Sequence, residues 1–215
     1  MLGQQLRGIN AVVFYVVDIF EASGSSLNSN LESCIVEGVQ VITTFFGAYI
    51  MDKTGRRLLL NLSSSIMAIS AAGLGAFFFI AQNQDNTALA SKIGMLPVAS
   101  MSLFIFAFSI GFGPIPWLMM SELFSPEVRS LASSFAVSFN WILAFLVTKF
   151  FTNIVNAVTE SFAFWIFTAI LVGVFLFCIF FVPETKGKKL DDIQKMFKSD
   201  QPYFIEIWKK NKNNS

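Results

Sequence analysis

The chain has 215 residues, of which 54% are hydrophobic, 15% aromatic and only 13% charged. A soluble domain needs a polar coat and carries about one quarter charged residues, so this composition excludes a water-soluble protein and indicates a membrane protein. The net charge of +1 argues against a nucleic-acid partner. Histidine is absent, and Cys34 and Cys178 lie far apart in apolar stretches, so we expect neither metal nor cofactor.

Charged residues divide the chain into six mainly apolar segments. The third to sixth segments are each uncharged over about the 20 residues that a helix needs to cross the bilayer core. The first and second segments are interrupted by a few polar residues. Spanning strands would be short and alternating, so we predict an all-α membrane protein with a bundle of six transmembrane helices in one half-domain, 1–182. The expected spans are about 1–20, 33–51, 58–81, 93–121, 130–150 and 162–182.

The basic residues set the expected orientation of this bundle. They gather in the connections after the second, fourth and sixth segments, whereas the opposite connections hold few. The side with more Lys and Arg is expected to be cytoplasmic, and it includes the tail 183–215. Leu190, Ile193 and Phe197 share one face of a short amphipathic helix expected in this tail. The tail is either solvated near anionic lipid or a docking site for a partner.

Three side-chain amides interrupt the first segment, those of Gln4, Gln5 and Asn10. An amide both donates and accepts hydrogen bonds, which suits an uncharged, hydroxyl-rich ligand better than an ion. On a regular helix Gln5 and Asn10 lie about 140° apart, so they share one cavity only if the ligand is wide or the helix is distorted, for instance at Gly8. The alternative is that these amides bond to neighbouring helices.

The fourth segment contains two glycines and two prolines near its middle, Gly111, Gly113, Pro114 and Pro116. Proline removes a helical hydrogen bond, so this pattern predicts a discontinuous helix of the kind that lines a site or a gate in transporters. Trp117 follows directly and offers a flat face that can stack on a sugar ring. A proline kink without ligand contact is the alternative.

Further polar residues inside the expected spans are binding candidates, because such residues are costly in lipid. Asn140 and Trp141 place an amide and an indole donor in the fifth segment. Gln40 lies deeper in the second segment than Glu37, which we expect to reach water at the outer end.

Opposite charges recur at the expected cytoplasmic ends of the helices. Such charges can form a network that holds helix ends together and breaks when the ends separate, although anchoring and topology alone would also explain them. The candidates are Asp52, Arg56, Arg57, Glu122, Arg129 and Glu184.

Four motifs, taken together and in this order, resemble the C-terminal half of a sugar transporter of the major facilitator superfamily, from about Gly3 to Phe197. They are Gln4-Gln5-Leu6-x-Gly8-x-Asn10, Asp52-Lys-x-Gly-Arg-Arg57, Gly113-Pro-Ile-Pro-Trp117 and Pro183-Glu-Thr-Lys-Gly187. Facilitative hexose transporters and insect facilitated trehalose transporters are the most similar groups. The resemblance implies transmembrane helices seven to twelve, the plasma membrane, and a missing N-terminal six-helix half as partner.

The resemblance also implies roles for single residues. The amides of Gln4, Gln5 and Asn10 would bind sugar hydroxyls, and Gln40 stands where the family has an asparagine. Trp117 would line the inner exit, and Asn140 and Trp141 would complete the pocket.

At the cytoplasmic end, the resemblance implies a salt-bridge network that favours the outward-open state. Its members would be Arg56, Arg57, Glu122 and Arg129. Three positions depart from the family pattern: Arg7 and Ser109 replace a small serine and an acidic residue, and Ala144 replaces an asparagine.

These observations favour transmembrane transport of a neutral sugar, a hexose or trehalose, by facilitated diffusion through alternating access. The chain would be the C-terminal half or a fragment of such a transporter. The alternative is a truncated paralogue that binds or regulates a full-length transporter and carries nothing. An enzyme is disfavoured, because the chain has no histidine and no convergent carboxylates within its spans.

Overall fold

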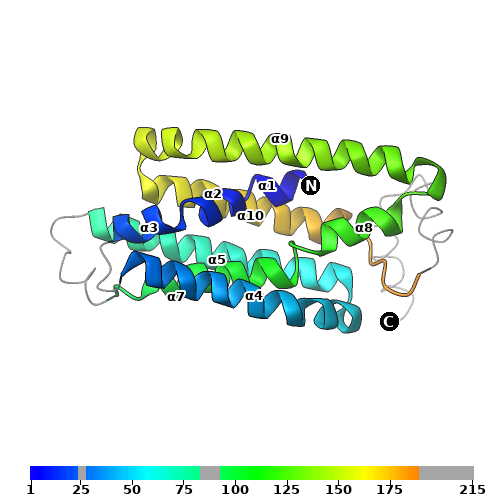
Figure 1. Ribbon diagram of the computed structural model, residues 1–215, viewed down its shortest axis with the longest axis horizontal. Coiled ribbons are helices and arrows are strands. Elements are labelled where there is room, and N and C mark those ends of the chain that lie inside the picture. Colours follow the sequence, from blue (N-terminus) through cyan, green and yellow to red (C-terminus); the bar gives the residue numbers. More distant parts are fainter. Residues whose placement is uncertain (24–27, 83–92, 189–215) are drawn as a thin grey trace.

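The computed structural model describes residues 1–23, 28–82 and 93–188. In these ranges the chain forms nine helices, most of which run along one long axis (Figure 1). They are α1 (Leu2–Gln5), α2 (Ile9–Phe14), α3 (Val16–Ser23), α4 (Ser29–Thr54), α5 (Arg56–Gln82), α7 (Leu96–Ile110), α8 (Ile115–Leu123), α9 (Pro126–Val158) and α10 (Glu160–Phe181). The amphipathic helix expected in the tail lies outside the described residues.

The first segment is broken into α1, α2 and α3. Gly8 separates α1 from α2 in the left-handed conformation, with φ of 82°. A Cβ atom at Gly8 would lie 2.6 Å from the ring of Phe167 on α10. Glycine is therefore required here for two reasons, the left-handed dihedral angle and the close contact of the backbone with Phe167. Tyr15 separates α2 from α3.

The fourth segment is also broken, as the glycines and prolines predict. Helix α7 ends at Ile110, and α8 begins at Ile115 after the turn that contains Gly111 and Pro114. Gly111 lies against α5, where an added Cβ would be 2.4 Å from the Ser63 Cβ. The Ser63 hydroxyl donates to the Ala107 carbonyl at 2.7 Å, which fixes α5 against the last turn of α7.

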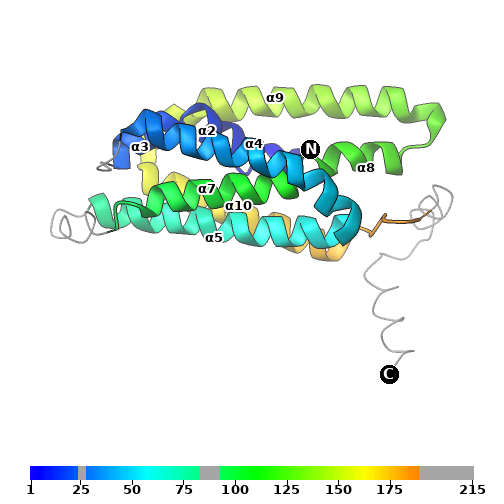
Figure 2. The same cartoon turned by 60° about the horizontal axis from the view of Figure 1, so that its bottom comes forward.

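Helix α5 lies along one side of the bundle and packs against both α7 and α10 (Figure 2). Helix α4 packs on the other side of α7, and α9 lies along α1, α2 and α10 (Figure 1). The rings of Phe78 on α5 and Phe164 on α10 stack with centroids 5.6 Å apart, and Met101 and Phe104 of α7 are buried in the same core.

Large apolar side chains cover the outer surface of the bundle. Phe45 on α4 is 82% exposed and Leu131 on α9 is 79% exposed. A soluble protein would not expose so many large apolar groups, whereas lipid or an apolar partner covers them.

Four helical stretches in the described residues are long and apolar enough to cross a membrane. They are Arg56–Gln82, Leu96–Leu123, Pro126–Val155 and Glu160–Phe181, which correspond to the last four of the expected spans. The first two expected spans are helical as well, but α4 has charged ends and the first segment is broken into short pieces. The chain is therefore an all-helical, multi-pass membrane protein.

Candidate functional site

The break at Gly8 brings two of the predicted amides into contact. Gln5, at the end of α1, is only 5% exposed, and its Oε1 accepts a hydrogen bond from Asn10 Nδ2 in the first turn of α2. On a regular helix these side chains would diverge, so the left-handed Gly8 is what allows them to meet. The helix is therefore distorted at Gly8, which is one of the two conditions under which Gln5 and Asn10 can share a site.

Gln4 connects the same segment to the other helix break. It is 5% exposed, and its Nε2 lies 3.4 Å from the Gly113 carbonyl oxygen between α7 and α8. The Gln4 Oε1 is buried and has no hydrogen-bond partner among the described residues. A ligand hydroxyl could satisfy this acceptor, because a buried amide oxygen without a partner is unfavourable.

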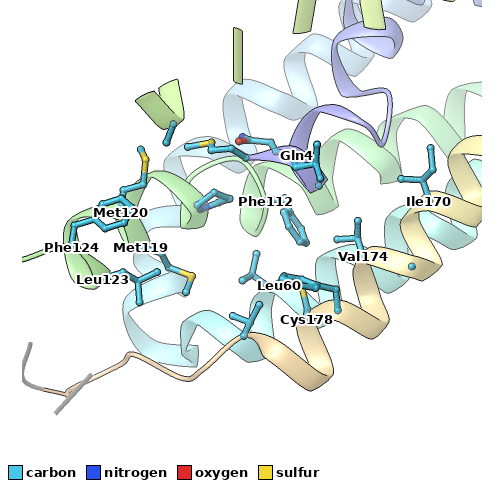
Figure 3. Close-up of a pocket in the computed structure, with 18 residues that line it drawn as sticks. Gln4, Leu60, Phe112, Met119, Met120, Leu123, Phe124, Ile170, Val174 and Cys178 are labelled. Atoms are coloured by element: carbon cyan, nitrogen blue, oxygen red, sulfur yellow. The ribbon is translucent and has the colours of Figure 1, made fainter. Parts of the chain in front are cut away.

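A cavity of about 570 Å³ adjoins Gln4 (Figure 3). Its volume falls in the range of small-molecule pockets. Most of its walls are apolar, formed by residues of α8 and α10 together with Leu60 of α5 and Phe112 of the break. The cavity offers apolar contact to a ligand, and Gln4 is the one predicted amide among the described residues that line it.

The remaining predicted binding residues lie on three other helices. Asn140 on α9 is 2% exposed, and its Oδ1 has no partner in the described structure, as is true of the buried Oε1 of Gln40 on α4. Trp117 on α8 is 37% exposed, whereas Trp141 is 63% exposed and points away from the described bundle. Among the described residues, no hydrogen bond joins these side chains to the amides of the first segment.

Arg7 is fully buried beside the amides. Its guanidinium carbon lies 3.3 Å from the ring centroid of Phe112, its Nε donates to the Gly3 carbonyl at 2.6 Å, and its Nη1 lies 3.5 Å from the Met67 sulfur. The sequence marked Arg7 as a departure from the family but gave no signal for these partners. Phe112 and Met67 are 105 and 60 residues away along the chain.

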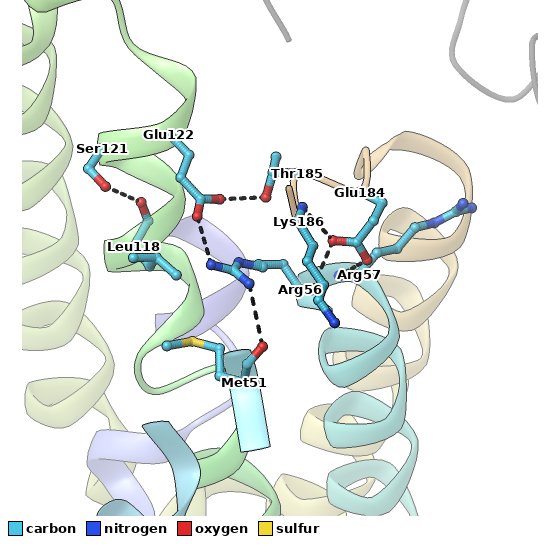
Figure 4. A network of polar contacts seen from close by, with 9 residues as sticks. All are labelled: Met51, Arg56, Arg57, Leu118, Ser121, Glu122, Glu184, Thr185 and Lys186. Atoms are coloured by element: carbon cyan, nitrogen blue, oxygen red, sulfur yellow. Dashed lines mark hydrogen bonds and ion pairs between the residues drawn. The ribbon is translucent and has the colours of Figure 1, made fainter. Parts of the chain in front are cut away.

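Polar contacts join α4, α5, α8 and the segment after α10 at the predicted cytoplasmic end (Figure 4). Arg56 in the first turn of α5 forms an ion pair of 3.1 Å with Glu122 near the end of α8. The other Glu122 oxygen accepts a hydrogen bond from Thr185 after α10, and Arg56 Nη1 donates to the Met51 carbonyl of α4 at 3.5 Å. Thr185, which sequence reasoning missed as a contact, stands next to Glu184 in the Pro-Glu-Thr-Lys motif.

Glu184 holds the beginning of α5 from the far end of the chain. Its carboxylate accepts from the backbone N–H groups of Arg56 and Arg57 at 3.0 and 3.1 Å. The first amide groups of a helix lack intrahelical acceptors, and a negative charge there is also favourable to the helix dipole. Glu184 therefore caps α5, while Arg57 Nη2 donates to the Ile179 carbonyl of α10.

The two other predicted network members differ from this arrangement. Arg129, at the start of α9, donates from Nε and Nη2 to the Phe124 carbonyl at 3.3 and 3.2 Å. It thereby holds the turn between α8 and α9. The side chain of Asp52 lies outside the described residues.

Broken helices with buried amides, in a bundle with an apolar outer surface, are features of the membrane domains of transporters. The chain belongs to the family of sugar (and other) transporters, whose model matches residues 1–197. This assignment confirms the resemblance seen in the sequence motifs.

The individual relatives are sugar transporters too. The chain is 46% identical over 194 residues to the facilitated trehalose transporter Tret1 of Bombyx mori, covering 90% of this chain and 38% of that protein. It is 45% identical over 195 residues to Tret1 of Culex quinquefasciatus, covering 91% of this chain and 37% of that protein. The chain thus spans less than two fifths of the length of these relatives.

A solved transporter has a similar fold. The proton:xylose symporter XylE bound to 6-bromo-6-deoxy-D-glucose matches with a TM-score of 0.75 at 30% identity, covering 90% of this chain and 40% of that one. An inward-open form of XylE from E. coli matches with the same TM-score.

Proposed function

We propose that this chain forms the C-terminal six spans of a transporter that moves a neutral sugar, a hexose or trehalose, by facilitated diffusion. The observation that carries the proposal is the contact of Gln5 with Asn10 across the Gly8 break, in the same segment as Gln4, which lines a cavity of about 570 Å³. Amides that already meet at a helix break present donors and acceptors together, as sugar hydroxyls require. The trehalose-transporter names of the relatives support the substrate class.

The second part of the proposal concerns the rest of the transporter. The matches cover about 38–40% of longer transporters, and the four motifs resemble a C-terminal half, helices seven to twelve, that works with an N-terminal six-helix half. The midplane site of such proteins lies between the halves, and one half rocks against the other. We place the assembled protein in the plasma membrane with the tail in the cytoplasm, as the basic residues indicate.

In this mechanism the sugar is held by polar groups and moved without covalent chemistry. Gln4, Gln5 and Asn10 bind hydroxyls, and the buried oxygens of Gln40 and Asn140 accept further hydrogen bonds. Trp117 and Trp141 offer ring faces from α8 and α9.

The polar network at the inner end has a separate role. The ion pair of Arg56 and Glu122 and the hydrogen bond from Thr185 join α5, α8 and the segment after α10. These contacts hold the inner helix ends together and favour the outward-open state, because the ends must separate before the inner side can open.

The test joins this chain, in frame, to the N-terminal part of the Bombyx mori relative and measures uptake of radiolabelled trehalose and glucose in oocytes. We expect saturable uptake of at least one sugar. The matched control is the same fusion carrying Gln82→Ala, which removes an exposed amide that bonds to Glu160 at 3.0 Å, far from the site. A fusion that reaches the cell surface but shows no saturable uptake of either sugar contradicts the proposal.

The second candidate is a non-transporting paralogue that binds or regulates a full-length transporter. Transcript sequence upstream of Met1 separates the candidates. An upstream reading frame with six more spans supports the transporter, and a start codon at Met1 with none supports the paralogue.

A further inference from the structure

Arg7 is a buried cation held between two broken helices. It lies two residues after the end of α1, and its guanidinium carbon lies 3.3 Å from the ring centroid of Phe112 in the break between α7 and α8. The Nε group donates at 2.6 Å to the Gly3 carbonyl in α1. The last carbonyl groups of a helix have no N–H donor within the helix, so the guanidinium supplies one. One side chain therefore contacts both breaks.

A second contact joins the same two elements. Gln4 Nε2 donates to the Gly113 carbonyl at 3.4 Å, one residue beyond Phe112. The α1 segment is thus fastened to this turn at two adjacent points, by a side-chain amide and by the guanidinium.

Because Arg7 is charged, separating the α1 segment from the turn that contains Phe112 costs free energy. Among the described residues no carboxylate lies within ion-pair distance of Arg7, and its Nη2 has no hydrogen-bond partner. A buried cation is costly unless nearby groups compensate for lost hydration, and here the ring face of Phe112, the Gly3 carbonyl and the Met67 sulfur do so. Moving the two breaks apart removes the ring face and leaves the charge less well compensated.

The shape of the side chain matters as well as its charge. A guanidinium carries several N–H donors in fixed directions, and in Arg7 its carbon lies over the Phe112 ring while Nε and Nη1 reach Gly3 and Met67. A lysine ammonium could keep a cation over the ring but could not present the same set of donors in the same directions.

We propose that Arg7 is a positioning residue that fastens the amide-bearing first segment to the break between α7 and α8, so that the two breaks move as one unit. A sugar held by Gln5 and Asn10 would then act directly on α8, the helix that carries Trp117 and Glu122. The proposal deepens the proposed function and rests on it for the role in transport. The fastening itself requires no sugar.

The test measures hydrogen–deuterium exchange by mass spectrometry on the purified 215-residue chain in lipid nanodiscs without sugar. In the Arg7→Met variant we expect the backbone amides of Gly111, Gly113 and Ile115 to exchange at least about tenfold faster, because a desolvated cation–π contact changes an opening equilibrium by that much. Arg7→Lys should restore part of this protection. The matched control is Arg129→Met, whose guanidinium contacts only the Phe124 carbonyl among the described residues, and it should leave these amides unchanged.

A reciprocal variant covers the case in which Arg7→Met does not fold. Phe112→Leu keeps apolar volume but removes the ring face, and should raise exchange across Leu6, Gly8 and Val12 by a similar factor, with no further rise when combined with Arg7→Met. The proposal is overturned if the exchange rate in the break that does not carry the substitution changes by less than about twofold. It is also overturned if exchange rises equally in all helices, or if Arg7→Lys behaves as Arg7→Met. Because no flux is measured, these outcomes are independent of the sugar-uptake test of the proposed function.

Discussion

At the scale of single residues, Gly8 decides whether the amides of the first segment act together. Its φ of 82° turns the chain so that Gln5 and Asn10 meet, and its missing side chain leaves room for Phe167. Both requirements fall on one residue, so a substitution there affects the backbone and the packing at once.

Gly8→Ala should destabilise the protein by about 2–6 kcal/mol, because a left-handed alanine is strained and its Cβ would overlap the Phe167 ring. A thermal melt of the purified chain in detergent measures the effect. The control is Gly38→Ala in α4, where an added Cβ meets nothing within 4 Å and alanine favours the helix. Equal melting temperatures for Gly8→Ala and the parent would disprove the structural role of this position.

Gln5→Ala and Asn10→Ala should each weaken sugar uptake in the fused transporter with little change in surface expression. Each removes hydrogen bonds to a desolvated ligand, about 1–3 kcal/mol, or roughly 5- to 150-fold in KM. Since the two side chains contact each other, the double variant should lose less than the sum of the single variants. Radiolabelled uptake across a range of sugar concentrations measures both effects, and an unchanged KM in both single variants would remove these residues from the binding site.

The sequence identified these amides but not their surroundings. Three amides in an apolar segment stand out in one sequence, and the helix distortion could be stated as a condition because Gly8 lies between them. The contacts of Arg7 with Met67 and Phe112 depend on how distant helices pack, which no local pattern specifies. The outward orientation of Trp141 depends in the same way on which face α9 turns toward α10.

At the scale of helices, the two broken segments differ in how visible their breaks are in the sequence. The turn from Gly111 to Pro114 follows from proline and glycine, which cannot continue a regular helix at low cost. The break at Tyr15 has no such residue. There the Tyr15 hydroxyl donates to the Thr148 carbonyl at 3.4 Å, and the ring centroids of Tyr15 and Phe151 are 5.1 Å apart. Both partners belong to α9, so Tyr15 packs against α9 at the point where the first segment is broken.

The inner ends of the helices give a prediction for gating. Glu122→Gln in the fused transporter should shift the population toward the inward-open state, because it removes the charge that pairs with Arg56. An exposed ion pair contributes little, but this one is partly buried and shares its acid with Thr185. Reaction rates of cysteines engineered on the inner and outer faces report the shift.

The matched control for this gating test is Glu127→Gln, at an exposed position in the first turn of α9. It removes one acidic charge from the same end of the bundle and should leave both labelling rates as in the parent. Identical labelling of the Glu122→Gln variant and the parent would show that the ion pair does not control opening.

At the scale of the whole molecule, the bundle presents half of the proposed pocket. Gln40, Asn140 and Gln4 each keep a buried side-chain oxygen without a partner in the described structure, while large apolar groups cover the outer faces. Hydrogen bonds to a sugar or to a second half would satisfy these oxygens, and apolar contact with lipid or that half would cover the faces.

The 215-residue chain reconstituted alone in liposomes should show no saturable flux of tracer trehalose or glucose. Alternating access needs two halves that rock around the site, and the proposed function assigns only one of them to this chain. The fused transporter, reconstituted in the same lipid, is the positive control. Saturable flux through the chain alone, blocked by excess unlabelled sugar, would show that a second half is not required.

The cap on α5 has a consequence for synthesis of the chain. The acceptor for the backbone N–H of Arg56 is Glu184, 128 residues later. At translation rates of roughly 5–20 residues per second, the first turn of α5 waits about 6–26 seconds for this carboxylate. Throughout that interval α7, α8, α9 and α10 are being made while the first turn of α5 lacks its cap. A chain released before residue 184 contains the nine described helices but lacks the carboxylate that joins the beginning of α5 to the segment after α10.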